Sequence, residues 1–176
     1  MPTRLLCILA ALTPLSISCV DDVIDSEIED ALDDNATVAD RACQAFVGEN
    51  GEKITAAADT SGAIPAVTNG PKLYAVTLPG DSPPREGVLQ FTPTSSADYL
   101  ILVQGGVPYA LQSASGSPIT AAEGGVECSD GDVPDGYTYT FEAGTPYNLT
   151  FGPTSAGSAD RPFKLVIALD PMVAEP

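Results

Sequence analysis

The chain has 176 residues, a length typical of one domain with short additional segments. It contains 24 Asp and Glu, 7 Lys and Arg and no His, which gives a formal net charge of −17 at pH 7. This charge argues against nucleic acid and anionic lipid surfaces as partners, because their phosphate groups would be repelled, and the lack of His removes the usual Ser-His-Asp and Cys-His catalytic arrangements.

The first 18 residues have the pattern of an export signal. Arg4 supplies one positive charge, residues 5–12 (LLCILAAL) form an apolar run, and Thr13-Pro14 ends it. The run is shorter than the ~20 apolar residues that a transmembrane helix needs. We therefore predict a cleaved signal peptide over residues 1–18.

The stretch that ends this signal, residues 15–19 (LSISC), resembles the lipobox of bacterial lipoproteins. In that family the signal peptide is cut just before a cysteine, which becomes the lipidated N-terminus. The resemblance implies that Cys19 carries fatty acyl chains and holds the protein to a membrane, and because Val20 rather than aspartate follows, it implies the outer membrane. Residues 16–18 also suit an ordinary secretory cleavage, which is the alternative.

The number of cysteines bears on the same prediction. Of the 4 cysteines, Cys7 leaves with the signal peptide, so Cys19, Cys43 and Cys128 remain. If Cys19 carries lipid, Cys43 and Cys128 are left as a pair, and an oxidising compartment permits a disulfide between them. Two buried free thiols are the alternative.

A strongly acidic segment follows Cys19. Between Val20 and Asp40 there are nine acidic residues and no basic one, and apolar residues are sparse. Ser26 and Glu29 could cap a short helix, but like charges four residues apart disfavour it. We predict that residues 19–42 are the lipidated N-terminus and a disordered tether. An acidic halophile surface is the other interpretation, although the excess acid is concentrated here.

The pattern from residue 43 onward indicates β-structure. Aromatic and β-branched residues alternate with polar ones in seven short runs, and Gly, Pro, Ser and Asp fill the spacers. This pattern predicts an all-β domain over residues 43–176: an antiparallel β-sandwich, jelly-roll or immunoglobulin-like, of about seven or eight strands. The apolar runs YLILV and LVIAL are expected to be central strands. The seven runs are residues 74–78, 89–91, 99–103, 109–111, 137–141, 147–151 and 163–169.

Two motifs within this domain resemble a known module. Phe91, Pro93 and Tyr99 match one, and residues 143–145 (AGT) with Tyr147 match the other. Together they are similar to the small β-sandwich that follows secreted bacterial peptidases, the pre-peptidase C-terminal type. The resemblance covers residues 72–169 and implies a sandwich fold.

Three aspartates are candidate ligands for calcium. Asp130, Asp132 and Asp135 lie in the stretch ECSDGDVPDG (127–136), and closely spaced carboxylates on a loop can supply several of the oxygen ligands that calcium takes. The competing interpretation is a polar turn whose Asp side chains bind local backbone N–H groups.

The six tyrosines could stack on sugars, or they could pack in the core. Residues 35–37 and 148–150 match the N-glycosylation acceptor sequence, a match that we interpret as coincidental in a bacterial protein.

From these observations we predict a lipid-anchored protein of the bacterial cell envelope. Its sandwich would act in binding or as a structural part, without catalysis and without a cofactor other than possible calcium. The partner would be an envelope protein or a glycan. The alternatives are a calcium-dependent adhesion or glycan-binding module and a hydrolase that uses two carboxylates.

Overall fold

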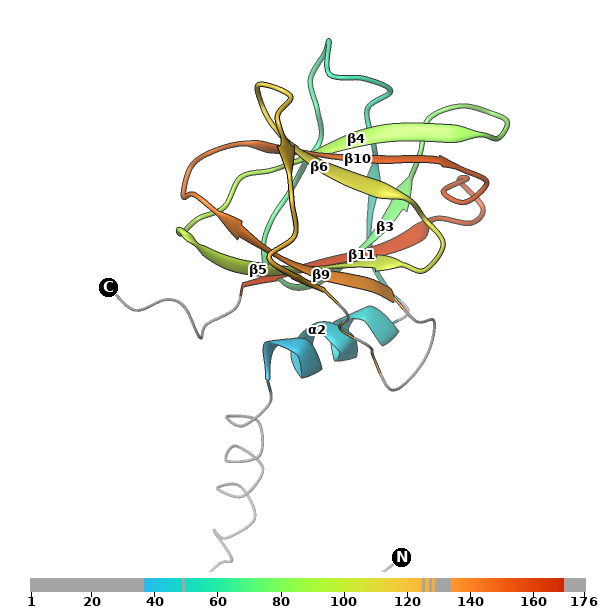
Figure 1. Cartoon of the computed structure of the whole chain (residues 1–176). Coiled ribbons are helices and arrows are strands. Elements are labelled where there is room, and N and C mark those ends of the chain that lie inside the picture. The colour runs from blue at the N-terminus through green and yellow to red at the C-terminus, as the bar shows by residue number, and fades with distance from the viewer. Residues whose placement is uncertain (1–36, 49, 125, 127, 129–133, 170–176) are drawn as a thin grey trace, which may run out of the picture. The chain divides into compact units, whose positions relative to one another are not determined.

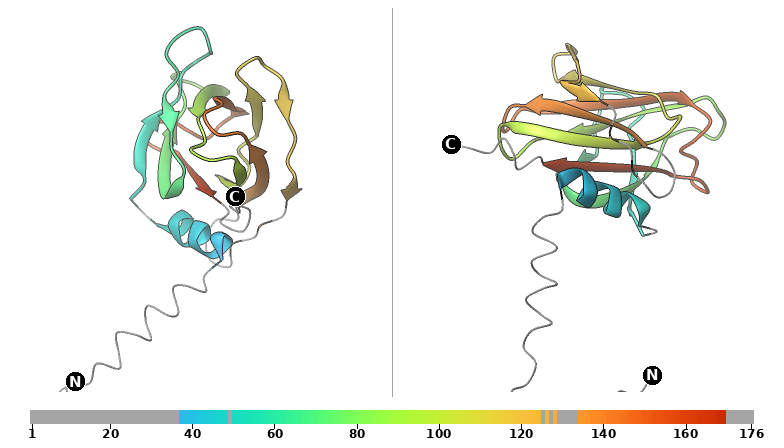
Figure 2. Two further views of the ribbon diagram at one scale, coloured as in Figure 1. Left: turned by 90° about the vertical axis from the view of Figure 1, so that its left-hand side faces the viewer. Right: turned by 60° about the horizontal axis from the view of Figure 1, so that its bottom comes forward.

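The computed structural model describes residues 37–48, 50–124, 126, 128 and 134–169. These residues form two β-sheets packed face to face and one helix on the outer face of one sheet (Figures 1 and 2). The elements are α2 (Val38–Val47), β1 (Glu52–Thr55), β2 (Ala66–Val67), β3 (Gly70–Thr77), β4 (Arg85–Phe91), β5 (Ala97–Gln104), β6 (Tyr109–Ser113), β7 (Pro118–Ile119), β8 (Glu123–Gly124), β9 (Pro134–Phe141), β10 (Tyr147–Thr154) and β11 (Phe163–Leu169).

The connectivity of the strands is that of a jelly roll. Sheet A has the order β1-β3-β11-β5-β9-β8 and sheet B the order β2-β4-β10-β6-β7. The long strands β3, β4, β5 and β6 alternate between the sheets, and so do β9, β10 and β11. An immunoglobulin-like fold would keep more sequential strands together in one sheet. The all-β sandwich is confirmed, and its topology is the jelly-roll alternative.

Two pairings depart from the predicted antiparallel arrangement. Strand β1 runs parallel to β3, and β2 runs parallel to β4, so both sheets are mixed. The reason is the path of the chain, which passes from β1 in sheet A to β2 in sheet B and back to β3. Such crossovers, unlike hairpins, bring neighbouring strands together in the same direction.

Each of the seven predicted runs forms a strand of at least five residues. In β10, for example, Tyr147, Leu149 and Phe151 point into the space between the sheets and are buried. The runs expected to be central, β5 and β11, are neighbours in the middle of sheet A and are buried on both faces.

The two motifs that resemble the pre-peptidase module meet in the structure. The rings of Phe91 and Tyr99 lie 5.3 Å apart, edge to face. The backbone N–H of Gly144 donates to the carbonyl of Pro93 at 2.9 Å, and the N–H of Glu142 donates to the hydroxyl of Tyr147 at 3.1 Å. These contacts join the two motifs, whose rings Phe91, Tyr99 and Tyr147 lie in the core while Ala143 and Gly144 are exposed.

Helix α2 begins at Val38, before residue 43, where the sequence predicts that the domain starts. A capping box at Thr37 fixes its first turn: the hydroxyl of Thr37 accepts from the N–H of Asp40 at 3.1 Å, and the carboxylate of Asp40 accepts from the N–H of Thr37 at 3.0 Å. The hydroxyl of Thr37 also donates to the Asp40 carboxylate at 2.7 Å, and this bond, together with the one from the Thr37 N–H, lowers the pKa of Asp40 from its usual value. The boundary at residue 43 is therefore corrected to include the whole helix.

The helix forms because one of its faces is apolar and finds a partner. Ala42 and Phe46, four residues apart, are almost completely buried against sheet A. There they meet Leu100, Leu102 and Val166 on its outer face. This contact explains why β5 and β11 are apolar on both faces. The described part of the chain holds no helix with the length and apolar character needed to cross a membrane.

Candidate functional site

A polar groove lies on the outer face of sheet B. Its volume is about 580 Å³, within the range of small-molecule sites. The loop 57–65 and the hairpin between β6 and β7 project beyond this face in Figure 1, and Figure 2 shows them rising on opposite sides. The groove is lined by residues of this loop, of the hairpin and of the strands between them.

Three amide side chains form the floor of the groove. Asn148 on β10 is directly opposite Gln90 on β4 and Gln112 on β6, so the three lie in one row across neighbouring strands. Because Leu149 and its inward-facing neighbours on β10 fill the core, Asn148 projects to the other face. All three amides line the groove.

Backbone hydrogen bonds hold the loop 57–65 at both ends. Ala57 exchanges two hydrogen bonds with Val88 of β4, at 2.9 and 2.8 Å, and Gln90 donates to the carbonyl of Pro65 at 2.9 Å. Within the loop, the carboxylate of Asp59 accepts from the N–H of Ser61 at 2.8 Å. This wall, which contributes Thr60, Gly62 and Ile64, is therefore fixed to the strand that supplies part of the floor.

The opposite wall is the turn of the β6–β7 hairpin, with Ala114, Ser115 and Gly116. The hydroxyl of Ser113 accepts from the N–H of Ser117 at 3.1 Å, and the N–H of Ser113 donates to the carbonyl of Ser117 at 2.8 Å. Gly116 has φ +86°, a conformation that favours glycine. The turn is thus held by its own hydrogen bonds and does not need a ligand to form.

Asn148 is the unusual residue of the floor. The residue is only 7% exposed, and its Oδ1 is buried without a hydrogen-bond partner among the described residues. A buried carbonyl oxygen without a donor costs about 1–3 kcal/mol, so such groups are uncommon in folded proteins. Since most of its surface is covered, Asn148 is also a poor acceptor for glycosylation, despite its sequence match.

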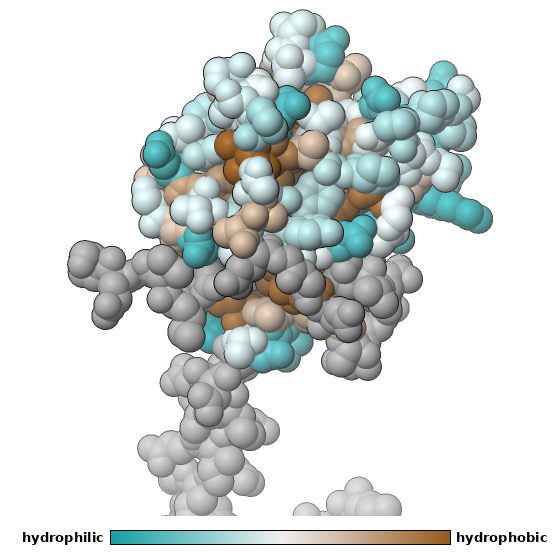
Figure 3. All heavy atoms as spheres, viewed as in Figure 1, coloured by the Kyte–Doolittle hydropathy of each residue, from teal (hydrophilic) through white to brown (hydrophobic). Residues whose placement is uncertain are grey.

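The groove carries no formal charge. None of the described residues that line it is Asp, Glu, Lys or Arg. Figure 3 shows mostly pale and teal atoms, which are neutral to hydrophilic, over the loop and hairpin at the top of the molecule. The groove therefore presents neutral hydrogen-bonding groups within a strongly acidic protein.

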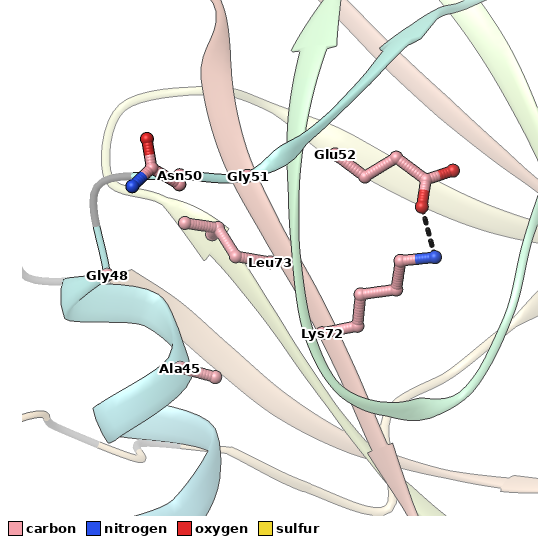
Figure 4. A pocket seen from close by; sticks show the side chains of 7 residues that line it. All are labelled: Ala45, Gly48, Asn50, Gly51, Glu52, Lys72 and Leu73. Carbon is pink, nitrogen blue, oxygen red and sulfur yellow. Dashed lines mark ion pairs between the residues drawn. The ribbon is translucent and has the colours of Figure 1, made fainter.

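A second depression, of about 510 Å³, lies between the end of α2 and strands β1 and β3 (Figure 4). Its charged residues, Lys72 and Glu52, point toward one another and form an ion pair. Both side chains are about half exposed, so the pair contributes little to stability. Because the two charges satisfy each other, this depression offers less to a ligand than the groove.

The predicted cysteine pair comes together. Cys43 on α2 and Cys128 are joined as a disulfide, with Cα atoms 5.3 Å apart. Cys128 is only 8% exposed and packs in the cluster that holds α2 against sheet A. Cys19, the predicted lipid site, lies outside the described residues.

Only one of the three aspartates predicted to bind calcium is among the described residues. Asp135 lies near the start of β9, opposite Val103 of β5, and is exposed. Asp130 and Asp132 lie outside the described residues. Within the described part of the chain, no three His, Cys, Asp or Glu side chains gather as a metal site would require. Calcium binding stays a prediction.

Most tyrosines pack in the core. Tyr74, Tyr99, Tyr139 and Tyr147 are at most 7% exposed, which confirms core packing for these four. Tyr137 is 39% exposed, and its ring contacts that of Tyr109. The hydroxyl of Tyr109 is buried without a hydrogen bond of good geometry, although Tyr139 lies close enough to affect its ionisation.

The buried hydroxyl of Tyr109 should make the stability of the protein fall at alkaline pH. Burial first, and then Tyr139, raise the pKa of Tyr109 well above its usual value of 10.0, and burial also raises that of Tyr139. The folded protein therefore keeps a proton that the unfolded chain loses above about pH 10. The stabilisation is complete below that pH and falls as pH rises, for Tyr109 by about 1.4 kcal/mol per pH unit.

We expect Tyr109→Phe to leave stability at pH 7 unchanged or higher, because it removes an unpaired hydroxyl. It should also reduce the loss of stability above pH 10. Urea unfolding at neutral and alkaline pH measures both effects, with Tyr137→Phe as the exposed control. Equal alkaline sensitivity of Tyr109→Phe and the wild type would contradict the assignment.

The amide row was not predicted from the sequence. The alternation of Gln and Asn with apolar residues predicts that one face of these strands meets water. In the structure Gln90 and Gln112 on this face are partly exposed, whereas Asn148 is buried. Which three polar residues stand side by side depends on strand order and register, for which the sequence holds no direct signal.

Comparison with models of known protein families gives no match, and comparison with curated proteins gives none either.

Proposed function

We propose that this chain is a lipid-anchored protein of the bacterial cell envelope whose jelly-roll sandwich acts as a binding module. The pairing of Cys43 with Cys128 carries the proposal. It uses both cysteines of the folded part, so that Cys19 is the one thiol left over after removal of a signal peptide. An odd thiol at the end of an export signal is accounted for if it holds lipid.

The remaining features support the same location and role. Disulfides persist in exported proteins and are rare in the cytosol. The acidic segment after Cys19 would act as the tether between lipid and sandwich. The groove on sheet B supplies a preformed site for a ligand, and its neutral hydrogen-bonding floor is suited to binding.

Membrane fractionation tests the anchor. The full chain, expressed with its signal in a bacterium that processes lipoproteins, should pellet with membranes and move into the detergent phase. The variant Cys19→Ser, with residues 1–18 replaced by an ordinary secretory signal that is cleaved without lipid, should be released into the soluble fraction, because it lacks the acyl chains. A Cys19→Ser protein that stays with the membrane, or a wild-type protein that is soluble, would refute the anchor.

A further inference from the structure

We propose that the groove over Gln90, Asn148 and Gln112 binds a neutral oligosaccharide of at least two sugar rings. The inference rests on the proposed binding role of the sandwich and assigns its ligand class. Asn148 lines the groove, and its carbonyl oxygen is buried without a hydrogen-bond donor among the described residues. If the side chain turns slightly toward the groove, a hydroxyl group of a ligand there can supply this donor.

The chemistry of the floor matches sugar hydroxyls. Each amide presents a carbonyl oxygen that accepts and an NH2 group that donates. A sugar hydroxyl both donates and accepts, so two neighbouring hydroxyls can satisfy one amide at both of its groups. A row of three amides on β4, β10 and β6 therefore fits a ligand that repeats such hydroxyl pairs along its length.

The size of the groove sets the minimum length of the ligand. Neighbouring strands are ~4.8 Å apart, so the row from Gln90 to Gln112 extends over roughly 10 Å. The volume of about 580 Å³ belongs to an open groove, not a closed pocket, and the walls stand on two sides. A single sugar ring would leave part of the floor uncovered, whereas a chain of rings can follow it.

Charge argues for a neutral ligand. No described lining residue is charged, so nothing in the groove compensates a charged group that leaves water. The net charge of −17 further repels anionic sugars. A polysaccharide rich in carboxylate or sulfate groups is therefore disfavoured.

An extended peptide fits less well. Peptides that add to a sheet bind at an edge strand with free backbone groups. Strand β10, in the middle of the floor, is paired with β4 on one side and β6 on the other. The floor of the groove offers a peptide side-chain amides, without the backbone ladder that gives such complexes their affinity.

The walls reduce the entropic cost of binding. The loop 57–65 is tied to β4 through Ala57 and Pro65, and the opposite turn is held by Ser113. A groove that is already formed does not have to be ordered by its ligand. Affinity then depends on the floor, which makes substitutions there informative.

A titration followed by NMR tests the proposal on the complete mature chain, with Cys19→Ser to keep it free of lipid. The probes are the neutral trisaccharides cellotriose, maltotriose and chitotriose, at millimolar concentrations. At least one should shift the side-chain NH2 resonances of Gln90, Gln112 and Asn148 as a group. Trigalacturonate, an anionic trisaccharide, should not. The absence of shifts with all three neutral probes, or equal binding of trigalacturonate, overturns the proposal.

Substitutions separate a binding role from a structural one. Asn148→Leu should weaken binding about tenfold or more, while stability stays the same or rises, because a buried unpaired group is removed. Gln112→Ala, at a partly exposed position, should also weaken binding. Thr150→Ala, two residues along the same face of β10, is the control and should bind as the wild type does. Unchanged affinity of Asn148→Leu and Gln112→Ala would overturn the proposal, whereas the fractionation experiment decides on the anchor alone.

Discussion

Removing the Cys43–Cys128 disulfide is expected to lower the free energy of unfolding by about 3–4 kcal/mol. The two cysteines are separated by 85 positions in the sequence, so the bond restricts a long loop in the unfolded chain. The chain-entropy model gives about 4.6 kcal/mol for a loop of this size, and residual structure in the unfolded state reduces the value. A domain of this size should then lose roughly 10–15 °C in melting temperature.

The double variant Cys43→Ala/Cys128→Ala, compared with the wild type in urea unfolding, measures this effect. Wild-type protein treated with a reductant should behave like the variant, and Cys19→Ser should behave like the wild type. Equal unfolding midpoints for the double variant and the wild type would contradict a disulfide that crosslinks the fold.

The second large effect is expected for Phe46→Ala, at about 3–5 kcal/mol. The ring of Phe46 is 1% exposed and packs with Leu102 and Val166 on the outer face of sheet A. Its loss leaves a cavity under α2 and removes the main apolar contact of the last helical turn. Thermal and urea unfolding measure the cost, and hydrogen exchange shows whether α2 opens before the sheets.

The adjacent residue provides a matched control. Val47 lies in the same helical turn but is 44% exposed, so Val47→Ala should change stability by less than about 0.5 kcal/mol. If both substitutions had the same small effect, α2 would not be docked on sheet A as described. Because Cys43 also lies on α2, the costs of losing Phe46 and the disulfide should not add.

The long strands of this fold are visible in its sequence, for a physical reason. Each of the seven runs alternates because one face fills the core, as Leu149 and Phe151 do on β10. Strands β5 and β11 have apolar residues on both faces, because a helix covers the face that points away from the sandwich core. Short strands of two to four residues, such as β2 and β1, carry too few residues for a period to show.

Helix α2 was not predicted because its sequence signals are weak. The helix also begins within the acidic segment and ends in the β-rich domain, so no single pattern covers it. Its apolar face consists chiefly of Ala42 and Phe46, and its capping residue Asp40 is also the last carboxylate of an acidic stretch. The sequence also could not distinguish a jelly-roll from an immunoglobulin-like topology. That choice depends on which strands pair across the sandwich, and alternation is the same in both folds.

For the candidate sites too, one part could be predicted from the sequence and another part could not. Counting cysteines was enough to propose the pair Cys43 and Cys128, since parity is a property of the sequence. The amide row was not within reach, because Gln90, Gln112 and Asn148 are far apart in the chain and meet only through strand order and register. The burial of Asn148 could be recognised only in the structure, where Gln90 and Gln112 lie on either side of it.

The anchor is the central claim, and mass spectrometry of the protein isolated from its native membranes tests it most directly. The account predicts that the mature chain begins at Cys19 and that this residue carries the mass of fatty acyl chains. A mature chain that begins at another residue, with Cys19 absent or unmodified, would contradict the account.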